Sequence, residues 1–245
     1  MDPILYNAMS GSQTDFYRQE ITGNNMANVH TVGFKADLYQ AQSMYVTGAV
    51  QNGATHAVRL PNGIDFSDGP LIHTGNDLDV AVRGMGWFAV QDPQGKEAYT
   101  KAGDLHVTEN GRLVTASNLP VLGDSGPISI PPAQRIEVGT DGTISIVPLE
   151  GLPDEIVVLD RLKLVKLDPD NLVKDTTGLM KLKEGALAPT DASLTVVKGA
   201  LEGSNVNSID QMINMIASGQ EFNAKTKMMQ TADNNAQKLA QLLLV

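Results

Sequence analysis

The carboxy-terminal segment at residues 207–244 reads NSIDQMINMIASGQEFNAKTKMMQTADNNAQKLAQLLL. It contains no proline, and a heptad frame runs through it in which seven of nine positions are apolar or alanine. The frame positions are Met215, Ser218, Phe222, Lys225, Met229, Ala232, Ala236, Leu239 and Leu243. Ile209, Ile213 and Ile216 continue the pattern upstream with a small shift of phase. The segment predicts an amphipathic helix about 55 Å long, capped by Asn207 or Ser208. Another part of the chain, or another molecule, must cover the stripe of heptad positions, which is called the seam.

The amino-terminal segment at residues 3–26, PILYNAMSGSQTDFYRQEITGNNM, predicts a second amphipathic helix. Asp2 and Pro3 suit the cap and the first helical position. Apolar or small side chains recur at Leu5, Met9, Ser12, Phe16, Gly23 and Met26. Polar residues at seam positions, Gln19 here and Lys225 in the last helix, favour a fixed register over maximal stability. The two helices are expected to pair, either within one chain or with neighbouring copies.

The region between the helices predicts β structure, because short runs of Val, Ile, Leu and Thr alternate with turn dipeptides. Two hairpins are explicit: LHVTENGRLVTA turns at Asn110-Gly111, and RIEVGTDGTISIV turns at Asp141-Gly142. RLKLVKL at residues 161–167 predicts a further strand, and residues 151–155 a loop. The predicted class is α+β. A β-rich body spans residues 69–203, an extended connector spans 36–68, and helical segments 1–35 and 204–245 pair as a coiled-coil-like assembly domain.

Composition excludes several classes of function. The 245 residues carry 18 Lys plus Arg against 28 Asp plus Glu, so the formal net charge is 18 − 28 = −10, which argues against a nucleic-acid partner. No apolar run approaches the roughly 20 residues that span a bilayer, and the amino terminus lacks signal-peptide features. The absence of cysteine excludes disulfides and thiolate metal sites. The four histidines, at positions 30, 56, 73 and 106, lack metal-site spacing, so neither a metal nor a cofactor is expected.

Two short motifs resemble catalytic signatures but predict turns. Gly123-Asp124-Ser125-Gly126-Pro127 is similar to the sequence around a protease serine, yet no His and Asp lie in a recognisable context. Gly84-Met85-Gly86 fits a loose dinucleotide fingerprint, but WFAV continues as a strand instead of opening a helix. The sequence therefore offers no catalytic constellation, and the chain is not expected to be an enzyme.

Three long stretches resemble the axial proteins of the bacterial flagellum, the rod and hook family. They are ITGNNMANVHTVGFK at residues 21–35, GPLIHTGNDLDVAVRGMGWFAV at 69–90, and GALEGSNVNSIDQMINMIASGQEFNAKTKMM at 199–229. The opening MDPILYNAMSGSQ and the length resemble a proximal-rod member. One departure is Gln220, which stands where relatives often carry an arginine.

The resemblance implies a structural subunit of the proximal rod, part of the axial drive shaft in the periplasmic basal body. It implies export through the flagellar type III apparatus without a cleaved signal peptide. The implied partners are other proximal- and distal-rod subunits and copies of the same chain, with no nucleic acid, no membrane insertion and no small-molecule substrate. A distal-rod or hook-like subunit, and a soluble adaptor or cap protein with an intramolecular helical hairpin, are the alternatives.

Under this resemblance, apolar helix positions are expected to fill holes between neighbouring helices, although simple packing within one chain is the plainer alternative. The expected interface residues are Leu5, Met9, Phe16, Met26, Phe34, Ile209, Ile213, Ile216, Phe222, Met229, Leu239 and Leu243. Asn24, Asn25, Asn28 and Gly33 are expected to form the helix stop and turn, Phe34 to anchor the connector on the helices, and Asn205 and Asn207 to cap the long helix. The terminal helices are expected to be frayed in the free chain and to become ordered on assembly.

Overall fold

The computed structural model describes residues 3–46, 54–59, 63–149 and 156–243. The chain forms two compact units. The helical unit comprises residues 1–29, 36–65 and 206–245, and the β unit comprises residues 30–35 and 66–205. The chain therefore passes from one unit to the other four times, and each unit is assembled from segments that are distant in the sequence.

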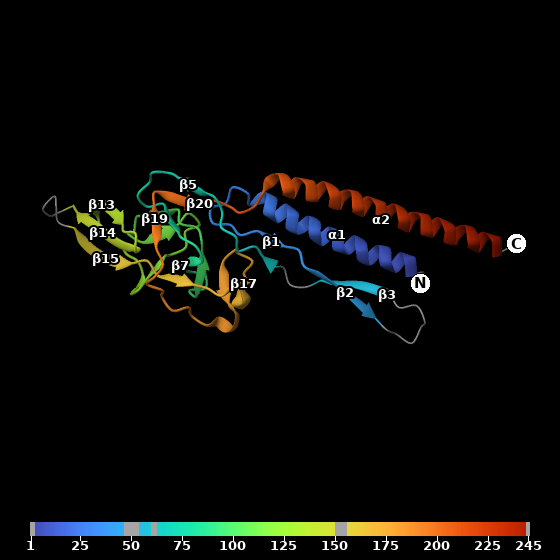
Figure 1. Ribbon diagram of the computed structural model, residues 1–245, viewed down its shortest axis with the longest axis horizontal. Helices are drawn as coiled ribbons and strands as arrows, with labels where there is room; N and C mark the ends of the chain where they lie inside the picture. Colours follow the sequence, from blue (N-terminus) through green and yellow to red (C-terminus); the bar gives the residue numbers. More distant parts are fainter. Residues whose placement is uncertain (1–2, 47–53, 60–62, 150–155, 244–245) are drawn as a thin grey trace. The chain divides into compact units, whose positions relative to one another are not determined.

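Over its described residues, the helical unit contains two helices and four short strands. The helices are α1, Pro3–Ala27, and α2, Ser208–Leu243, which run side by side in opposite directions (Figure 1). The strands are β1, Asp37–Leu38; β2, Ala41–Val46; β3, Ala54–Arg59; and β4, Gly63–Ile64. β1 pairs with β4 and β2 pairs with β3, both antiparallel. The segment expected as an extended connector is thus organised into two strand pairs.

Local signals define the helix ends. The Asn207 side-chain oxygen accepts a hydrogen bond from the Ile209 amide at 3.0 Å, so the prediction that Asn207 caps the long helix is confirmed. At the end of α1, the Asn28 amide donates to the Asn24 carbonyl at 3.2 Å, and Gly33 follows with φ of +67°. Positive φ favours glycine because it lacks a Cβ. Asp2, the predicted cap of α1, lies outside the described residues.

The β unit is built around one five-stranded antiparallel sheet in the order β16–β7–β8–β18–β17. Its strands are β7, Gly86–Gln91; β8, Glu97–Thr100; β16, Leu164–Lys166; β17, Leu172–Lys174; and β18, Met180–Leu182. A three-stranded sheet follows the order β13–β14–β15, with β13 at Ala133–Val138, β14 at Thr143–Pro148 and β15 at Val157–Arg161.

Four two-stranded pairs and two short 3₁₀ turns complete the described part of the β unit. The pairs join β5, Leu71–His73, to β20, Ala200–Glu202; β6, Val80–Val82, to β19, Val196–Lys198; β9, Leu105–Val107, to β10, Leu113–Thr115; and β11, Leu122–Gly123, to β12, Gly126–Pro127. The 3₁₀ turns are Pro169–Asn171 and Lys183–Gly185.

Both predicted hairpins are present, as the pairs β9–β10 and β13–β14. Ser125 lies in the tight turn between β11 and β12, and the segment after Gly84 enters strand β7, so both turn predictions are confirmed. The strand predicted at residues 161–167 is confirmed as β16, but it is shorter than expected, because Arg161 ends β15 of the other sheet and β16 begins at Leu164. The Lys163 amide between them donates to the Leu122 carbonyl instead. The predicted loop at residues 151–155 lies outside the described residues.

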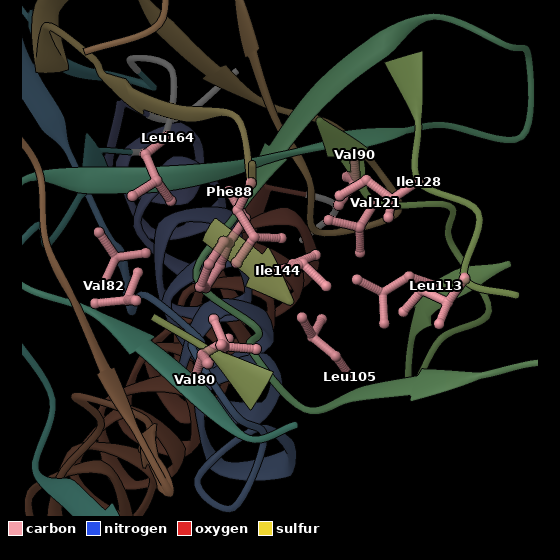
Figure 2. Close-up of a cluster of buried hydrophobic side chains, with 14 of the residues drawn as sticks. Val80, Val82, Phe88, Val90, Leu105, Leu113, Val121, Ile128, Ile144 and Leu164 are labelled. Atoms are coloured by element: carbon pink, nitrogen blue, oxygen red, sulfur yellow. The ribbon is translucent and has the colours of Figure 1, made fainter. Parts of the chain in front are cut away.

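Apolar side chains from both larger sheets and from the paired strands meet in one core (Figure 2). Phe88 and Val90 of β7, Ile144 of β14 and Leu113 of β10 are all buried there. Burial of such side chains stabilises a fold by about 1.5–3 kcal/mol each. This core gives the β unit a source of stability that does not depend on the helices.

Candidate assembly interface

A partly buried ion pair connects the two helices. Lys225 Nζ lies 2.7 Å from Oδ2 of Asp15, whose side chain is 1% exposed, and also donates to the Gly11 carbonyl at 3.2 Å. A Cβ on Gly11 would lie 3.1 Å from Lys225 Cε, so the glycine gives the lysine side chain room to cross α1. Lys225 therefore occupies the seam, as its place in the heptad frame predicted.

A second ion pair fixes the same register. Arg18 Nη1 lies 3.2 Å from Glu221 Oε2, and both side chains are partly exposed. Asp15 and Arg18 are three residues apart, as one turn of α1 requires, and their partners Lys225 and Glu221 are four apart in the opposite order. This spacing is a signal in the sequence that the periodicity analysis missed. Gln19, expected at the seam, is exposed, so that prediction is wrong.

The side chains buried on the two helices are mostly small or polar. Among the described side chains of α1 and α2, those that are buried are Ala8, Ser12, Asp15, Ile21, Thr22, Asn25 and Ser218. Ile21 is the one large apolar side chain in this set. Met215 approaches the helix partner at Gly23, where a Cβ would lie 4.0 Å from its terminal methyl group. The described contact between α1 and α2 therefore combines the charged pair of Asp15 and Lys225 with the half-buried Met215 packed against Gly23.

Large apolar side chains of the helices point outward instead. Ile209, Ile213 and Ile216 are 68%, 58% and 56% exposed, and at 3.6 residues per turn they lie on the face of α2 opposite Ser218 and Lys225. The expectation that they continue the heptad seam is therefore wrong. On α1, Met9 and Phe16 are exposed and seven residues apart, which places them on one face. The helical unit thus carries large apolar side chains on parts of its outer surface.

The other expected interface residues have mixed environments. Phe222 is partly exposed, and Met26 and Met229 are half-buried. The side chains of Leu5, Leu239 and Leu243 lie outside the described part of the structure. Phe34, expected to anchor the connector on the helices, belongs to the compact β unit, where Lys174 Nζ lies 4.0 Å from the centre of its ring.

The asparagines at the end of α1 have separate roles. Asn28 Nδ2 donates to the Asn24 carbonyl at 2.9 Å, which confirms the predicted helix stop. Asn25 instead makes two hydrogen bonds to the backbone of Asp37, donating to its carbonyl at 2.8 Å and accepting from its amide at 2.9 Å. These two bonds fasten the start of β1 to α1.

Asn205 does not cap α2, because the helix begins three residues later at Ser208. Its Nδ2 lies 3.2 Å from the Ser67 carbonyl and the Ser67 hydroxyl, and both residues belong to the β unit. The prediction of a capping role for Asn205 is therefore wrong, and the residue connects two distant segments of the chain.

Neither helix, over its described length, is apolar enough to cross a membrane. The described residues also contain no cluster of three His, Asp or Glu side chains arranged to hold a metal ion. The distinctive features of the chain are therefore the outward apolar helix faces and the charged contacts that fix the helix register.

Models of three flagellar protein families match the chain. They are "Flagella basal body rod protein" at residues 5–35, "Flagellar hook protein FlgE/F/G D1 domain" at 81–146, and "Flagellar basal body rod FlgEFG protein C-terminal" at 197–242. Flagellar basal-body rod protein FlgF of Salmonella typhimurium and that of Escherichia coli K12 are each 34% identical to the chain, over 99% of both sequences. Flagellar basal-body rod protein FlgG of Bacillus subtilis is 31% identical, over 97% of this chain and 98% of its own length.

Proposed function

The chain belongs to the family of flagellar basal-body rod proteins, and we propose that it is built into the rod by its two terminal helices, through apolar contacts with the helices of neighbouring subunits. It is a FlgF-like structural subunit of the proximal rod. The proposal concerns how such a subunit is joined to the next.

The observation that carries the proposal is the distribution of apolar side chains on the helices. Ile209, Ile213 and Ile216 form an exposed stripe on the face of α2 that points away from α1. Met9 and Phe16 add exposed apolar surface on α1. Contiguous exposed apolar surface on a protein indicates an interaction site. Helices of neighbouring subunits supply the matching surface.

The small amount of large apolar surface buried on α1 and α2 supports the same proposal. Among their described side chains, Ile21 is the one large apolar side chain that is buried, so apolar burial within the chain contributes little free energy to these helices. The partly buried pair of Asp15 and Lys225 adds little, because desolvation offsets much of its Coulomb attraction. Most helical stability in proteins comes from the packing of an apolar face. The helices of the free chain are therefore expected to fray, and burial of their outer faces in the rod stabilises them.

The proposal extends to domains, partners and location. Residues 1–35 and 204–245 serve as the rod-core domain, residues 36–68 as its connector, and residues 69–203 as the outer body. The partners are other proximal- and distal-rod subunits and copies of this chain, and the flagellar type III apparatus exports the chain without a cleaved signal peptide. The site of assembly is the periplasmic part of the basal body.

Quantitative mass spectrometry of purified basal bodies tests this assignment. The chain is expected at a fixed copy number relative to the other rod subunits, and this number should persist after the hook is sheared off. Copy numbers that scale with hook length would indicate a hook-like subunit instead. Absence from basal bodies would favour a soluble adaptor with an intramolecular helical hairpin.

A further inference from the structure

A buried carboxylate in the β unit binds two lysines that come from distant parts of the sequence. The Glu202 side chain, at the end of β20, is 3% exposed. Its Oε1 lies 2.7 Å from Lys35 Nζ and its Oε2 lies 3.1 Å from Lys101 Nζ. The Gly69 amide also donates to Oε1, at 3.2 Å. Both carboxylate oxygens are thus occupied by donors from three different segments.

The two ammonium groups also bind backbone carbonyls. Lys35 Nζ donates to the Ser67 carbonyl at 2.7 Å, and Lys101 Nζ donates to the Gly84 carbonyl at 2.6 Å. Both lysine side chains are almost fully buried. The carboxylate of Asp68 lies 3.9 Å from each ammonium and is largely exposed. The cluster of Lys35, Asp68, Lys101 and Glu202 therefore contains two positive and two negative charges.

The ionisation of this cluster follows from its burial and its contacts. Burial disfavours the charged form of Glu202, but the hydrogen bond from Lys35 and the charge of Lys101 outweigh it, so the pKa of the carboxyl lies below its ordinary value. Burial has the largest influence on Lys101 and lowers the pKa of its ammonium, although Glu202 opposes this shift. The charges stabilise one another, and a change to one member disturbs the others.

Three segments that lead toward the helical unit converge on this cluster. Residues 30–35 are held by Lys35 and by the Gly33 amide, which donates to the Glu202 carbonyl at 2.7 Å. Residues 66–69 are held through the Ser67 carbonyl and the Gly69 amide. Residues 202–205 carry Glu202 itself, and the Asn205 amide donates to the Phe34 carbonyl at 3.3 Å. These segments include the β-unit side of all four passages of the chain between the two units.

We propose that Glu202 is the positioning residue of a clamp that fastens these three segments to one another within the β unit, so that a load reaching the β unit along any one of them is shared by all three. This inference rests on the proposed function, because a subunit of a rotating drive shaft transmits force through the segments that join its parts. Charged hydrogen bonds suit the task, since they are directional and fix donor and acceptor positions within a few tenths of an ångström.

Hydrogen exchange of the full chain tests the clamp directly. In Glu202→Gln, the carboxylate charge is lost and the added side-chain NH₂ group faces the lysine donors. The amides of Gly69 and Asn205 are then expected to exchange at least tenfold faster than in the wild type. The core amides of Leu113 and Val121 are expected to stay within twofold.

The matched control is Glu97→Gln. Glu97 forms a comparable mostly buried ion pair, with Oε2 2.8 Å from Lys163 Nζ, but it lies in β8, away from the three segments. This variant is expected to leave the exchange of Gly69 and Asn205 within twofold. Lys35→Met, which keeps the length of the side chain, provides a second test should Glu202→Gln fold poorly, and it is expected to accelerate the same two amides.

Two exchange results would overturn the clamp. If Gly69 accelerates while Asn205 does not, Glu202 holds one segment only. If the core amides accelerate as much as Gly69 and Asn205 in both Glu202→Gln and Lys35→Met, the cluster serves global stability only.

The swimming speed of cells in media of rising viscosity tests whether the clamp helps the rod to bear mechanical load. Cells with Glu202→Gln are expected to slow at least twofold more than cells with Glu97→Gln at high viscosity. Equal speeds at every viscosity, with normal amounts of the variant in basal bodies, would overturn the clamp and leave the rod assignment intact. Absence of the wild-type chain from basal bodies would instead overturn the rod assignment.

Discussion

Replacement of Ile209, Ile213 and Ile216 by glutamine is expected to abolish incorporation into the rod while the β unit stays folded. Complete burial of an isoleucine side chain stabilises a protein or complex by about 1.5–3 kcal/mol. The exposed fractions of 68%, 58% and 56% therefore leave about 3–5 kcal/mol available for a neighbouring subunit. Loss of this term lowers an association constant roughly a hundredfold to several thousandfold.

Two measurements on the same variant separate assembly from folding. Quantitative mass spectrometry of basal bodies gives the number of copies incorporated, and urea unfolding of the purified chain gives the free energy of unfolding. The latter is expected to change by less than about 0.5 kcal/mol, as is usual for exposed sites. The control variant replaces Asn223, Gln230 and Asn234 with serine, because these exposed polar residues lie on the same face of α2, several turns further along.

Incorporation of the triple glutamine variant at wild-type levels would refute the reasoning, since the stripe would then face no neighbour. A large fall in the free energy of unfolding would also contradict it, because the three side chains would be packing within the chain itself. Loss of incorporation in the serine control alone would show that the interface lies further along α2, at Asn223, Gln230 and Asn234.

Three further predictions follow from single contacts. Charge reversal in Asp15→Lys or Lys225→Asp is expected to lower incorporation roughly fivefold to a hundredfold, because breaking the pair costs about 1–3 kcal/mol. The double variant is expected to recover most of the incorporation in the same basal-body count, and no recovery would exclude direct pairing. Gly33→Ala is expected to lower the free energy of unfolding by more than about 2 kcal/mol, since positive φ costs about 1–2 kcal/mol and the new Cβ would lie 2.4 Å from the Lys101 carbonyl carbon. In the control Gly75→Ala, φ is also positive but no atom lies within 4 Å of the new Cβ, so the loss measured by urea unfolding should be about 1 kcal/mol. Equal losses in the two variants would contradict the steric explanation. Burial raises the pKa of Tyr99 to about 12, so the stabilising contribution of the neutral side chain is complete below its ordinary pKa of 10 and is lost as pH rises through about 12. Between pH 9 and 12, the midpoint temperature of thermal unfolding should therefore fall more steeply for the wild type than for Tyr99→Phe. Parallel curves for the two proteins would contradict the raised pKa.

Much of the local structure could be predicted from the sequence, because its signals lie within a few residues. The dipeptides Asn110-Gly111 and Asp141-Gly142 specify tight turns, and Asn207 specifies a helix start through its side-chain oxygen. The bounds of the strand expected at residues 161–167 were too wide, because alternation of apolar residues does not reveal where a chain leaves one sheet for another.

The environment of the helix faces could be predicted only in part. Heptad spacing identified the seam at Ser218 and Lys225, but it could not show that Ile209, Ile213 and Ile216 lie on the opposite face, because both stripes have helical spacing. The ion pairs of Asp15 and Arg18 connect residues more than 200 positions apart.

The cluster around Glu202 left no local signal for the same reason. Its lysines are 167 and 101 positions away in the chain. Only the folded β unit brings Lys35 and Lys101 to one carboxylate, so no spacing rule applied to the sequence could have identified them.

Site-specific photocrosslinking in cells with assembled flagella shows whether the exposed stripe on α2 contacts a neighbouring subunit. A photoreactive amino acid at position 213 is expected to form covalent products of higher mass with other rod subunits or with a second copy of the chain. The same amino acid at position 218, which faces α1, is expected to crosslink within the chain and give no such product. Crosslinks from position 213 that remain within one chain would show that the exposed stripe on α2 is not an assembly surface.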